Sequence, residues 1–321
     1  MLSAYAASID FENPLSGLVV GDRPEPEPPD GWVTVNVRAA ALNHHDLWSL
    51  RGIGLPADRL PMTLGCDAAG VDPDGNEVIV HAVIGSDGWS GDETLDPKRS
   101  LLSERHQGAL AERVTVPRRN LVPKPPELSF EQAACLPTAW LTAYRMLFTR
   151  GQLKPGQTVL VQGSSGGVAT ALIKLGSSAG IRVWTTGRSE QKRALALALG
   201  ADAVFEPGAR LPERVDAVME TVGQATWSHS VKSLKQDGVI VISGATSGDA
   251  PAAELTRIFF LQLRVVGSTM GTRDELERLA RLLVQKRIEP AISQTLPLAD
   301  ARAGFEAMLE GRTSGKIVFT V

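Results

Sequence analysis

The feature that most constrains this chain is a buried-type strand that runs through small residues directly into a helix. The segment Thr158-Val-Leu-Val-Gln-Gly-Ser-Ser-Gly-Gly-Val-Ala169 is apolar at first and small from Gly163 onward. Glycine lets a backbone turn sharply and approach a ligand, while the free amides of a helix N-terminus favour an anion. The predicted phosphate-binding loop consists of Gly163, Ser164, Ser165, Gly166, Gly167 and Val168.

The glycine spacing departs from the strict G-x-G-x-x-G motif, because Ser164 stands where the motif has its first glycine. A turn of this kind can also be merely structural, so the neighbouring strands and helices decide whether it is interpreted as a nucleotide-binding loop. Strands and helices alternate around it: strands are expected at 158–162, 182–186, 204–205, 217–220, 239–243 and 264–269, with helices at 168–178 and 189–199. Parallel strands need crossover helices, so we predict an α/β fold with a doubly wound parallel sheet of the Rossmann type.

The N-terminal part of the chain has a different pattern of residues, typical of short β-strands. Residues 32–38 alternate apolar and polar side chains, as a half-buried strand does, and Pro24-Glu-Pro-Glu-Pro-Pro-Asp-Gly31 excludes regular structure before them. Short apolar stretches separated by turn residues favour a small barrel or sandwich. Residues 86–103 are polar and contain glycine, so we expect an exposed loop there.

Composition excludes several classes of protein. The chain contains 33 Lys and Arg residues and 36 Asp and Glu residues, which gives a net charge of −3. We therefore expect no broad basic surface for nucleic acid. No apolar run reaches the ~18–20 residues that span a bilayer, and the N-terminus lacks a secretory signal. Two cysteines, Cys66 and Cys135, supply neither a disulfide framework nor a cysteine-rich zinc cluster. These features are typical of a cytoplasmic protein.

The end of the second strand of the parallel sheet bears on which dinucleotide is bound. An NAD site usually has Asp or Glu ~20 residues beyond the loop. Here the segment reads Thr186-Gly-Arg-Ser-Glu-Gln-Lys192, without that carboxylate at its start. Arginine can hold a 2′-phosphate with two hydrogen bonds, and a serine at a helix start can donate to it. We predict NADPH, held by Gly187, Arg188, Ser189 and Lys192. The alternative is an ordinary solvated basic helix start.

With these residues in view, the chain resembles the medium-chain dehydrogenase/reductase superfamily, and within it the zinc-free quinone oxidoreductase branch. The resemblance covers essentially the whole chain and is carried by Ala39-Ala-Ala-Leu-Asn-His-His-Asp46, Leu64-Gly-Cys-Asp-Ala-Ala-Gly70, Leu136-Pro-Thr-Ala-Trp-Leu-Thr-Ala-Tyr144, the loop after residue 162 and Gly315-Lys-Ile-Val318. It implies a GroES-like catalytic domain over 1–125, completed by 272–321, and a Rossmann domain over 126–271. It also implies an active site between the domains and a homodimer or homotetramer joined through the strand near residues 264–270.

The resemblance further implies roles for single residues. Asn43 is expected to hydrogen-bond cofactor or substrate, and Thr138 to lie near the nicotinamide ribose or carboxamide. Residues expected near the cofactor are Gly244, Ala245, Ser268, Thr269 and Lys316, the last at the phosphates. His45 is the first candidate for a proton donor, because imidazole donates near neutral pH and Asp46 lies beside it in the sequence. A histidine satisfied by the backbone is the alternative.

The residues at the zinc-ligand positions of the superfamily indicate whether this chain can bind a catalytic zinc. Zinc members of the superfamily have Cys at the position of Asn43, His-Glu at Cys66-Asp67, and Cys near Thr138. An amide and a hydroxyl are poor zinc ligands, so we expect no catalytic zinc. Residues 86–105 contain no cysteine for a structural zinc. The chain has other histidines that could form a different site, among them His44, His45 and His81.

These features together predict an NADPH-dependent, zinc-independent oxidoreductase that reduces quinones or other α,β-unsaturated carbonyls. Such acceptors delocalise the incoming electrons to a remote oxygen and need less electrophilic help than a simple ketone. The alternatives are an alcohol dehydrogenase or carbonyl reductase of the same superfamily, and a non-catalytic NADPH-binding protein. Residues 51–55 lack the tyrosine that acyl-thioester enoyl reductases of this superfamily have at this point.

Overall fold

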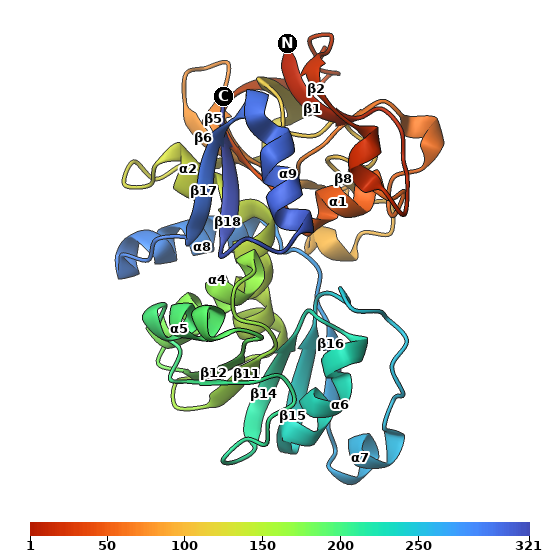
Figure 1. The fold of residues 1–321 in the computed structure, drawn as a ribbon. Helices are drawn as coiled ribbons and strands as arrows, with labels where there is room; N and C mark the ends of the chain where they lie inside the picture. Colours follow the sequence, from red (N-terminus) through yellow and green to blue (C-terminus); the bar gives the residue numbers. More distant parts are fainter. The chain divides into compact units, whose positions relative to one another are not determined.

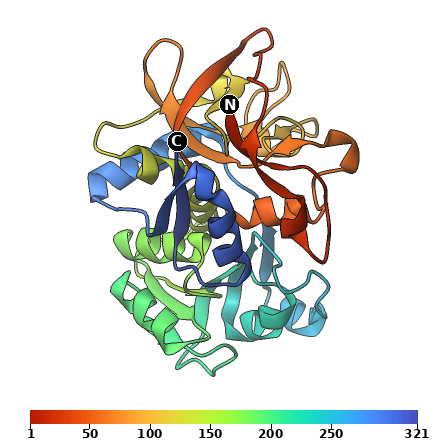
Figure 2. The ribbon, with the colours of Figure 1, turned by 45° about the horizontal axis from the view of Figure 1, so that its top comes forward.

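The computed structural model describes residues 1–321, and the chain divides into two compact units. Unit 1 comprises Met1–Leu141 and Met270–Val321, so both chain ends belong to it (Figure 2). Unit 2 comprises Thr142–Thr269. The first break therefore lies later than the predicted one at residue 125, because the helix that follows Ser129 packs on the sheet of unit 1.

Unit 2 is built on a six-stranded sheet with the order β13-β12-β11-β14-β15-β16, and all its strand pairs are parallel. Its strands are β11 (Thr158–Val161), β12 (Arg182–Thr186), β13 (Ala203–Phe205), β14 (Val215–Glu220), β15 (Leu234–Ile242) and β16 (Arg264–Gly267). The chain runs outward from β11 in one direction and from β14 in the other. The strand order thus reverses between β11 and β14, which is where open parallel sheets bind ligands. The predicted doubly wound sheet is confirmed.

The helices of unit 2 cover this sheet. They are α4 (Gly167–Ser178), α5 (Glu190–Ala198), α6 (Gln224–Ser233) and α7 (Leu255–Phe260), with α3 (Leu141–Tyr144) and the π-helix η6 (Arg145–Arg150) at the start of the unit. In Figure 1, α5 lies beside β12 and α6 beside β15. A core of Leu160, Trp184, Val218, Trp227 and Ile240 joins sheet and helices. Burying each such side chain stabilises the fold by roughly 1.5–3 kcal/mol.

Unit 1 contains a seven-stranded sheet with the path β10-β6-β5-β3-β18-β17, to which β9 adds by pairing with β3. Its strands are β3 (Trp32–Ala41), β5 (Asp67–Val71), β6 (Glu77–Val80), β9 (Arg113–Pro117), β10 (Leu121–Pro123), β17 (Ile292–Pro297) and β18 (Lys316–Thr320). A smaller sheet has the order β2-β1-β4, with β1 (Leu2–Ala6), β2 (Leu18–Asp22) and β4 (Met62–Thr63). Because β18 pairs with β3, the C-terminal end of the chain completes this β-rich unit.

Helices and short turns complete unit 1. They are α1 (His44–Leu50), α2 (Phe130–Ala134), α8 (Arg273–Lys286), α9 (Ala301–Leu309) and the 3-10 turns η1 (Pro14–Gly17), η2 (Ala57–Arg59), η4 (Arg118–Asn120) and η7 (Leu298–Asp300). Ser129 and Thr272 cap α2 and α8 through capping boxes. Around Pro137, whose ring disfavours regular α-helix, the chain forms the π-helix η5 (Leu136–Trp140), a form that often occurs at functional sites. None of the helices is long and apolar enough to cross a membrane.

The segment 86–103 is more ordered than expected. It contains the turn η3 (Glu93–Leu95) and strand β8 (Ser100–Leu101), which pairs with β7 (Val83–Ile84). Glu93 Oε1 accepts a hydrogen bond from the Arg273 amide at 2.5 Å and lies 3.0 Å from His81 Nε2. His81 is 1% exposed. Much of the segment, including residues 87–91 and 97–99, is exposed as expected, but the carboxylate of Glu93 anchors it to the start of α8 and to the interior.

Replacing Glu93 by Gln is expected to lower the free energy of unfolding by about 1–2 kcal/mol near neutral pH. Contacts with His81 and the Arg273 amide hold the pKa of Glu93 below its usual 4.5 against the opposing effect of burial. Its contribution is therefore complete above the unfolded pKa and is lost as the pH falls through the folded value. Urea unfolding across this range should show wild type and variant converging in acid. A constant difference at every pH would contradict the assignment, and Asp87→Asn on the same segment serves as an exposed control.

Candidate active site

The loop after β11 has the open geometry of an anion-binding turn. Gly163 has a φ of +87°, and a Cβ built on Gly163 or Gly166 would meet nothing within 4 Å. Gly166 precedes the 12-residue helix α4, and no side chain caps the first amides of this helix. Those amides are free to bind an anion at the positive end of the helix dipole. The loop therefore fits the diphosphate of a dinucleotide.

A buried polar network holds this loop in place from behind. The Gly163 amide donates to Thr186 Oγ1 (3.0 Å), and the Thr186 hydroxyl donates to Gln162 Oε1 (3.0 Å). Gln162 Nε2 donates to Ser230 Oγ (2.9 Å), which donates to Glu220 Oε2 (2.6 Å). Hydrogen bonds thus connect the carboxyl ends of β11, β12 and β14. The roles of Gln162 and Glu220 were not predicted from the sequence. The available signal is that each is a polar residue at the carboxyl end of an otherwise apolar strand.

The end of β12 lies against the loop. A Cβ on Gly187 would come within 2.8 Å of Ser164 Oγ and of Arg193 Cγ, so this position needs glycine. Ser189 caps α5, accepting from the Lys192 amide at 3.3 Å, and Arg188 is exposed. The predicted residues at the 2′-phosphate are therefore neighbours of the predicted loop. Their contact with a phosphate stays a prediction.

The other predicted cofactor residues also follow strands of this sheet. Gly244 and Ala245 follow β15, where a Cβ on Gly244 would lie 3.0 Å from Thr221 O. The Ser268 amide donates to Ile242 O at 2.8 Å, and the Ser268 hydroxyl is buried without a hydrogen-bond partner in the protein. Thr269 is exposed. The structure places all four at the carboxyl edge of the parallel sheet, and their roles stay predictions.

Unit 1 contains a buried cluster that includes Asn43, predicted for catalysis, and Lys316, predicted to lie near the cofactor. Lys316 is 2% exposed, and its ammonium donates to Leu42 O (2.8 Å), Asn43 Oδ1 (2.6 Å) and Asp67 Oδ2 (2.9 Å). Asn43 Nδ2 donates to the same Asp67 oxygen at 2.9 Å and to Ala41 O at 3.4 Å. All three donors of the lysine are used within unit 1.

This geometry bears on two expectations. Lys316 uses all three of its donors on protein acceptors of unit 1, whereas the resemblance implied a role at the cofactor phosphates, and that role stays a prediction. Asn43 already uses its amide oxygen and both amide hydrogens on protein groups. These contacts orient Asp67 and Lys316, and a contact of Asn43 with cofactor or substrate stays a prediction. Asp67, which the sequence analysis treated only as part of a lost zinc site, is the centre of the cluster.

The π-helix η5 packs on β5, the strand that begins with Asp67. Burial raises the pKa of the Cys135 thiol, immediately before η5, to about 12, and the charges of Lys316 and Asp67 act on it in opposite directions. The Thr138 hydroxyl, on η5, is buried and has no hydrogen-bond partner in the protein. The structure thus places Thr138 in an element that contacts the predicted catalytic cluster.

His45 has partners other than the one expected. Its Nε2 lies 2.9 Å from Glu104 Oε1, and its Nδ1 lies 3.5 Å from Cys66 Sγ. Burial lowers the pKa of His45, but the interactions with Cys66, Glu104 and Asp46 outweigh it and raise the pKa well above the usual value. Asp46 instead accepts from the amides of Asn43 (2.9 Å) and Gly65 (2.8 Å). Glu104, distant in sequence, could not be identified from the local pattern.

The donor set does not fit a catalytic zinc. Asn43 and the Asp67 oxygen nearest to it are bound to the Lys316 ammonium, a cation that would repel a metal ion. The Cys66 thiol donates to Leu102 O at 3.3 Å. No group of three or more His, Cys, Asp or Glu side chains is arranged to hold a metal. Four zinc ligands, or three with an open position, are therefore not brought together.

The fold and the two sites define a class: a dinucleotide-dependent oxidoreductase with a β-rich unit and a Rossmann unit. Two family models match the chain. The alcohol dehydrogenase GroES-like domain matches residues 29–126, and the zinc-binding dehydrogenase model matches residues 167–285. The chain belongs to the medium-chain dehydrogenase/reductase superfamily, as its sequence motifs predict.

Similar proteins, two of them of known structure, match nearly the whole chain. One, described as an NAD-dependent alcohol dehydrogenase, is 33% identical with a TM-score of 0.92 and full coverage of both chains. A 2-octenoyl-CoA carboxylase reductase in complex with NADP and 2-octenoyl-CoA is 26% identical with a TM-score of 0.91, covering 99% of this chain and 87% of the other. The acryloyl-coenzyme A reductase of Metallosphaera sedula is 28% identical over 324 residues, 95% of this chain and 96% of the relative.

Proposed function

We propose that this protein is an NADPH-dependent, zinc-independent oxidoreductase that reduces quinones or other α,β-unsaturated carbonyls. The observation that carries the proposal is the open, uncapped loop after β11. The segment that follows β12 lies against this loop and contains Arg188, with no acidic residue between the end of β12 and this arginine. NADPH, when bound there, supplies a hydride. The residues of the chain bind and orient it.

The choice of NADPH rests on residues 186–192. Gly187 brings this segment against Ser164 of the loop, and the guanidinium of exposed Arg188 can bind a 2′-phosphate through two parallel hydrogen bonds. The relative solved with NADP supports this choice, whereas the NAD-dependent relative represents the alternative. In this chain the first acidic residue after β12 is Glu190, inside α5.

The choice of acceptor rests on the Asn43–Asp67–Lys316 cluster. Its ammonium is saturated by protein acceptors, so it offers no electrophile to a simple ketone. An α,β-unsaturated carbonyl or a quinone accepts hydride without a strong Lewis acid, because charge spreads to a distant oxygen. Two relatives named above, reductases of acryloyl-CoA and of 2-octenoyl-CoA, act by name on unsaturated thioesters. An alcohol dehydrogenase is the second candidate, favoured by the NAD-dependent relative.

One panel of assays tests the proposal. NADPH absorbance is followed with 1,4-benzoquinone, a simple enone and crotonyl-CoA, and NADP reduction is followed with a secondary alcohol. Turnover of any unsaturated acceptor without added metal, and after treatment with a chelator, is the expected result. Alcohol oxidation alone would establish the second candidate. Tight NADPH binding without turnover on the whole panel would instead indicate a non-catalytic binding protein.

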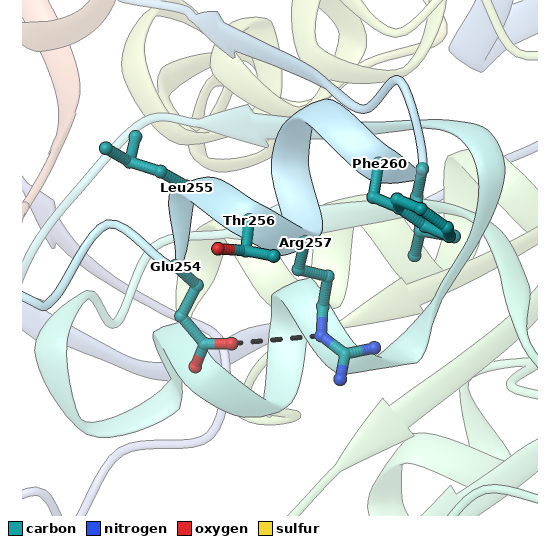
Figure 3. Close-up of a pocket in the computed structure, with 6 residues that line it drawn as sticks. Glu254, Leu255, Thr256, Arg257 and Phe260 are labelled. Atoms are coloured by element: carbon teal, nitrogen blue, oxygen red, sulfur yellow. Dashed lines mark ion pairs between the residues drawn. The ribbon is translucent and has the colours of Figure 1, made fainter.

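We further propose that the protein is a cytoplasmic homodimer or homotetramer joined through the β16 edge of unit 2. Both cysteines are free thiols, which suits a reducing compartment. A strand at the edge of a sheet has unpaired backbone groups, and β16 adds Val265, 44% exposed. The short helix α7 adds Leu255, Phe259 and Phe260, all at least 67% exposed. Figure 3 shows the ≈ 590 Å³ pocket that α7 lines, with the Glu254–Arg257 ion pair beside it.

Replacing Phe259 and Phe260 together by Asp is expected to convert this oligomer to monomers. Two charges in the middle of an apolar contact would have to be buried without partners. Sedimentation velocity measures the change, and NADPH affinity should stay the same, since the phosphate loop lies on a different element. Arg210→Asp, an exposed change elsewhere in unit 2, is the control. A wild-type protein that sediments as a monomer would refute the proposed interface.

A further inference from the structure

The buried Asp67 carboxylate uses only one of its two oxygens. Oδ2 accepts from both Lys316 Nζ and Asn43 Nδ2, whereas Oδ1 has no hydrogen-bond partner in the protein. Asp67 is 0% exposed. A buried carboxylate oxygen without a donor is unfavourable, so this oxygen calls for a donor from outside the protein, such as a water or a ligand. This oxygen is therefore a candidate binding atom.

A second unpartnered polar atom lies on the adjacent element. Thr138 Oγ1 is buried without a partner, and its π-helix η5 packs directly on β5, the strand that Asp67 begins. Thr138 also belongs to a helical form that is rare in proteins and frequent at functional sites. The two orphaned groups thus lie on two contacting elements.

The chemistry of these two groups limits what they can bind. An ionised carboxylate only accepts hydrogen bonds, whereas a hydroxyl can also donate one. The charge of Asp67 is balanced by Lys316 at 2.9 Å, so the site as a whole is neutral and favours an uncharged group. Such a group accepts from Thr138 and donates to Asp67. A quinone oxygen, which is a carbonyl before reduction and a hydroxyl after it, meets both conditions in turn.

We propose that Asp67 Oδ1 and Thr138 Oγ1 bind the reacting oxygen of a quinone acceptor, Thr138 donating to the carbonyl and Asp67 accepting from the hydroxyl that forms when NADPH supplies the hydride and solvent supplies the proton. This inference rests on the proposed function and names two binding residues for it. It also assigns the two atoms to different stages of the reaction. Thr138 acts on the oxidised acceptor, and Asp67 acts on the reduced product.

Thr138→Val tests the first contact while keeping the shape of the side chain. The KM for 1,4-benzoquinone should rise about tenfold, since one hydrogen bond to the carbonyl is lost. The melting temperature should not fall, because the hydroxyl has no partner in the protein to lose. The Kd for NADPH, measured by fluorescence, should stay unchanged. Ser49→Ala removes another buried, unpartnered hydroxyl, on α1, and is the matched control with an unchanged KM.

Asp67→Asn tests the second contact. Inhibition by added hydroquinone should weaken about tenfold, while the KM for the quinone changes much less. Asp67→Glu, which retains the carboxylate, should restore part of the hydroquinone affinity that Asp67→Asn loses. The inference is overturned if Thr138→Val leaves the quinone KM unchanged, or if it weakens NADPH binding by the same factor, because the site would then belong to the cofactor. A wild-type protein without NADPH-dependent turnover would instead refute the proposed function itself.

Discussion

Lys316→Met is expected to lower the free energy of unfolding of unit 1 by about 3–5 kcal/mol, the cost of leaving one member of a buried ion pair alone. The change would leave the Asp67 carboxylate at 0% exposure with only the Asn43 amide as a donor. It would also remove the ammonium that bridges β3 and β18 through Leu42 O, just beyond the end of β3. The strand pairing that completes unit 1 from the C-terminal end of the chain should therefore weaken first.

Hydrogen exchange of peptides from β3, β5 and β18 measures this loss in unit 1, and peptides from β11 and β14 in unit 2 are the internal control. The double variant Asp67→Leu/Lys316→Met should recover more than half of the lost stability, since replacing both partners of a buried pair by apolar side chains is often neutral. A loss below about 1 kcal/mol for Lys316→Met, the value of an exposed pair, would contradict the buried-pair assignment.

Arg188→Ala is expected to weaken NADPH binding by roughly 10- to 100-fold and to leave NADH binding nearly unchanged. A charge-assisted hydrogen bond to phosphate contributes enough free energy for a change of this size. Only the 2′-phosphate distinguishes the two cofactors, so the effect must appear as a change in their affinity ratio. Arg188 is exposed and makes no hydrogen bond within unit 2 that the fold depends on, so stability should not change.

Fluorescence titration with each cofactor measures the ratio, and Arg210→Ala, at another exposed arginine of unit 2, is the matched control. An equal loss for NADPH and NADH would mean that Arg188 contacts a part that both share. No loss for either would mean that the segment after β12 is only a solvated helix start.

The sequence was sufficient to predict the parts of the fold whose signals are local. Apolar strands alternating with helices predicted the parallel sheet, with β12 confirmed at both ends and the other strands shifted by one or two residues at one end. The start of β15 is the exception, lying five residues before the predicted one. The capping boxes at Ser129 and Thr272 were recognisable because their partners lie three residues apart. β17 was missed because its pattern is largely polar and its stability comes from parallel pairing with β18.

The candidate site was predictable in its position and less so in its contacts. Asn43, His45 and Thr138 do lie in or beside the buried cluster of unit 1. Their partners come from residues far away in the sequence: Lys316 lies 273 residues beyond Asn43, and Glu104 lies 59 beyond His45. No local pattern encodes such pairs. The anchoring of residues 86–103 could not be predicted for the same reason, since Glu93 binds the Arg273 amide, which lies 180 residues further along the chain.

The most direct test of the account is calorimetric titration of the purified, chelator-treated protein with NADPH and with NADH. The account predicts one NADPH site per chain, with an affinity at least tenfold higher than that for NADH, a difference of about 1.4 kcal/mol. Equal affinities, tighter binding of NADH, or NADPH binding that appears only when zinc is restored would contradict it.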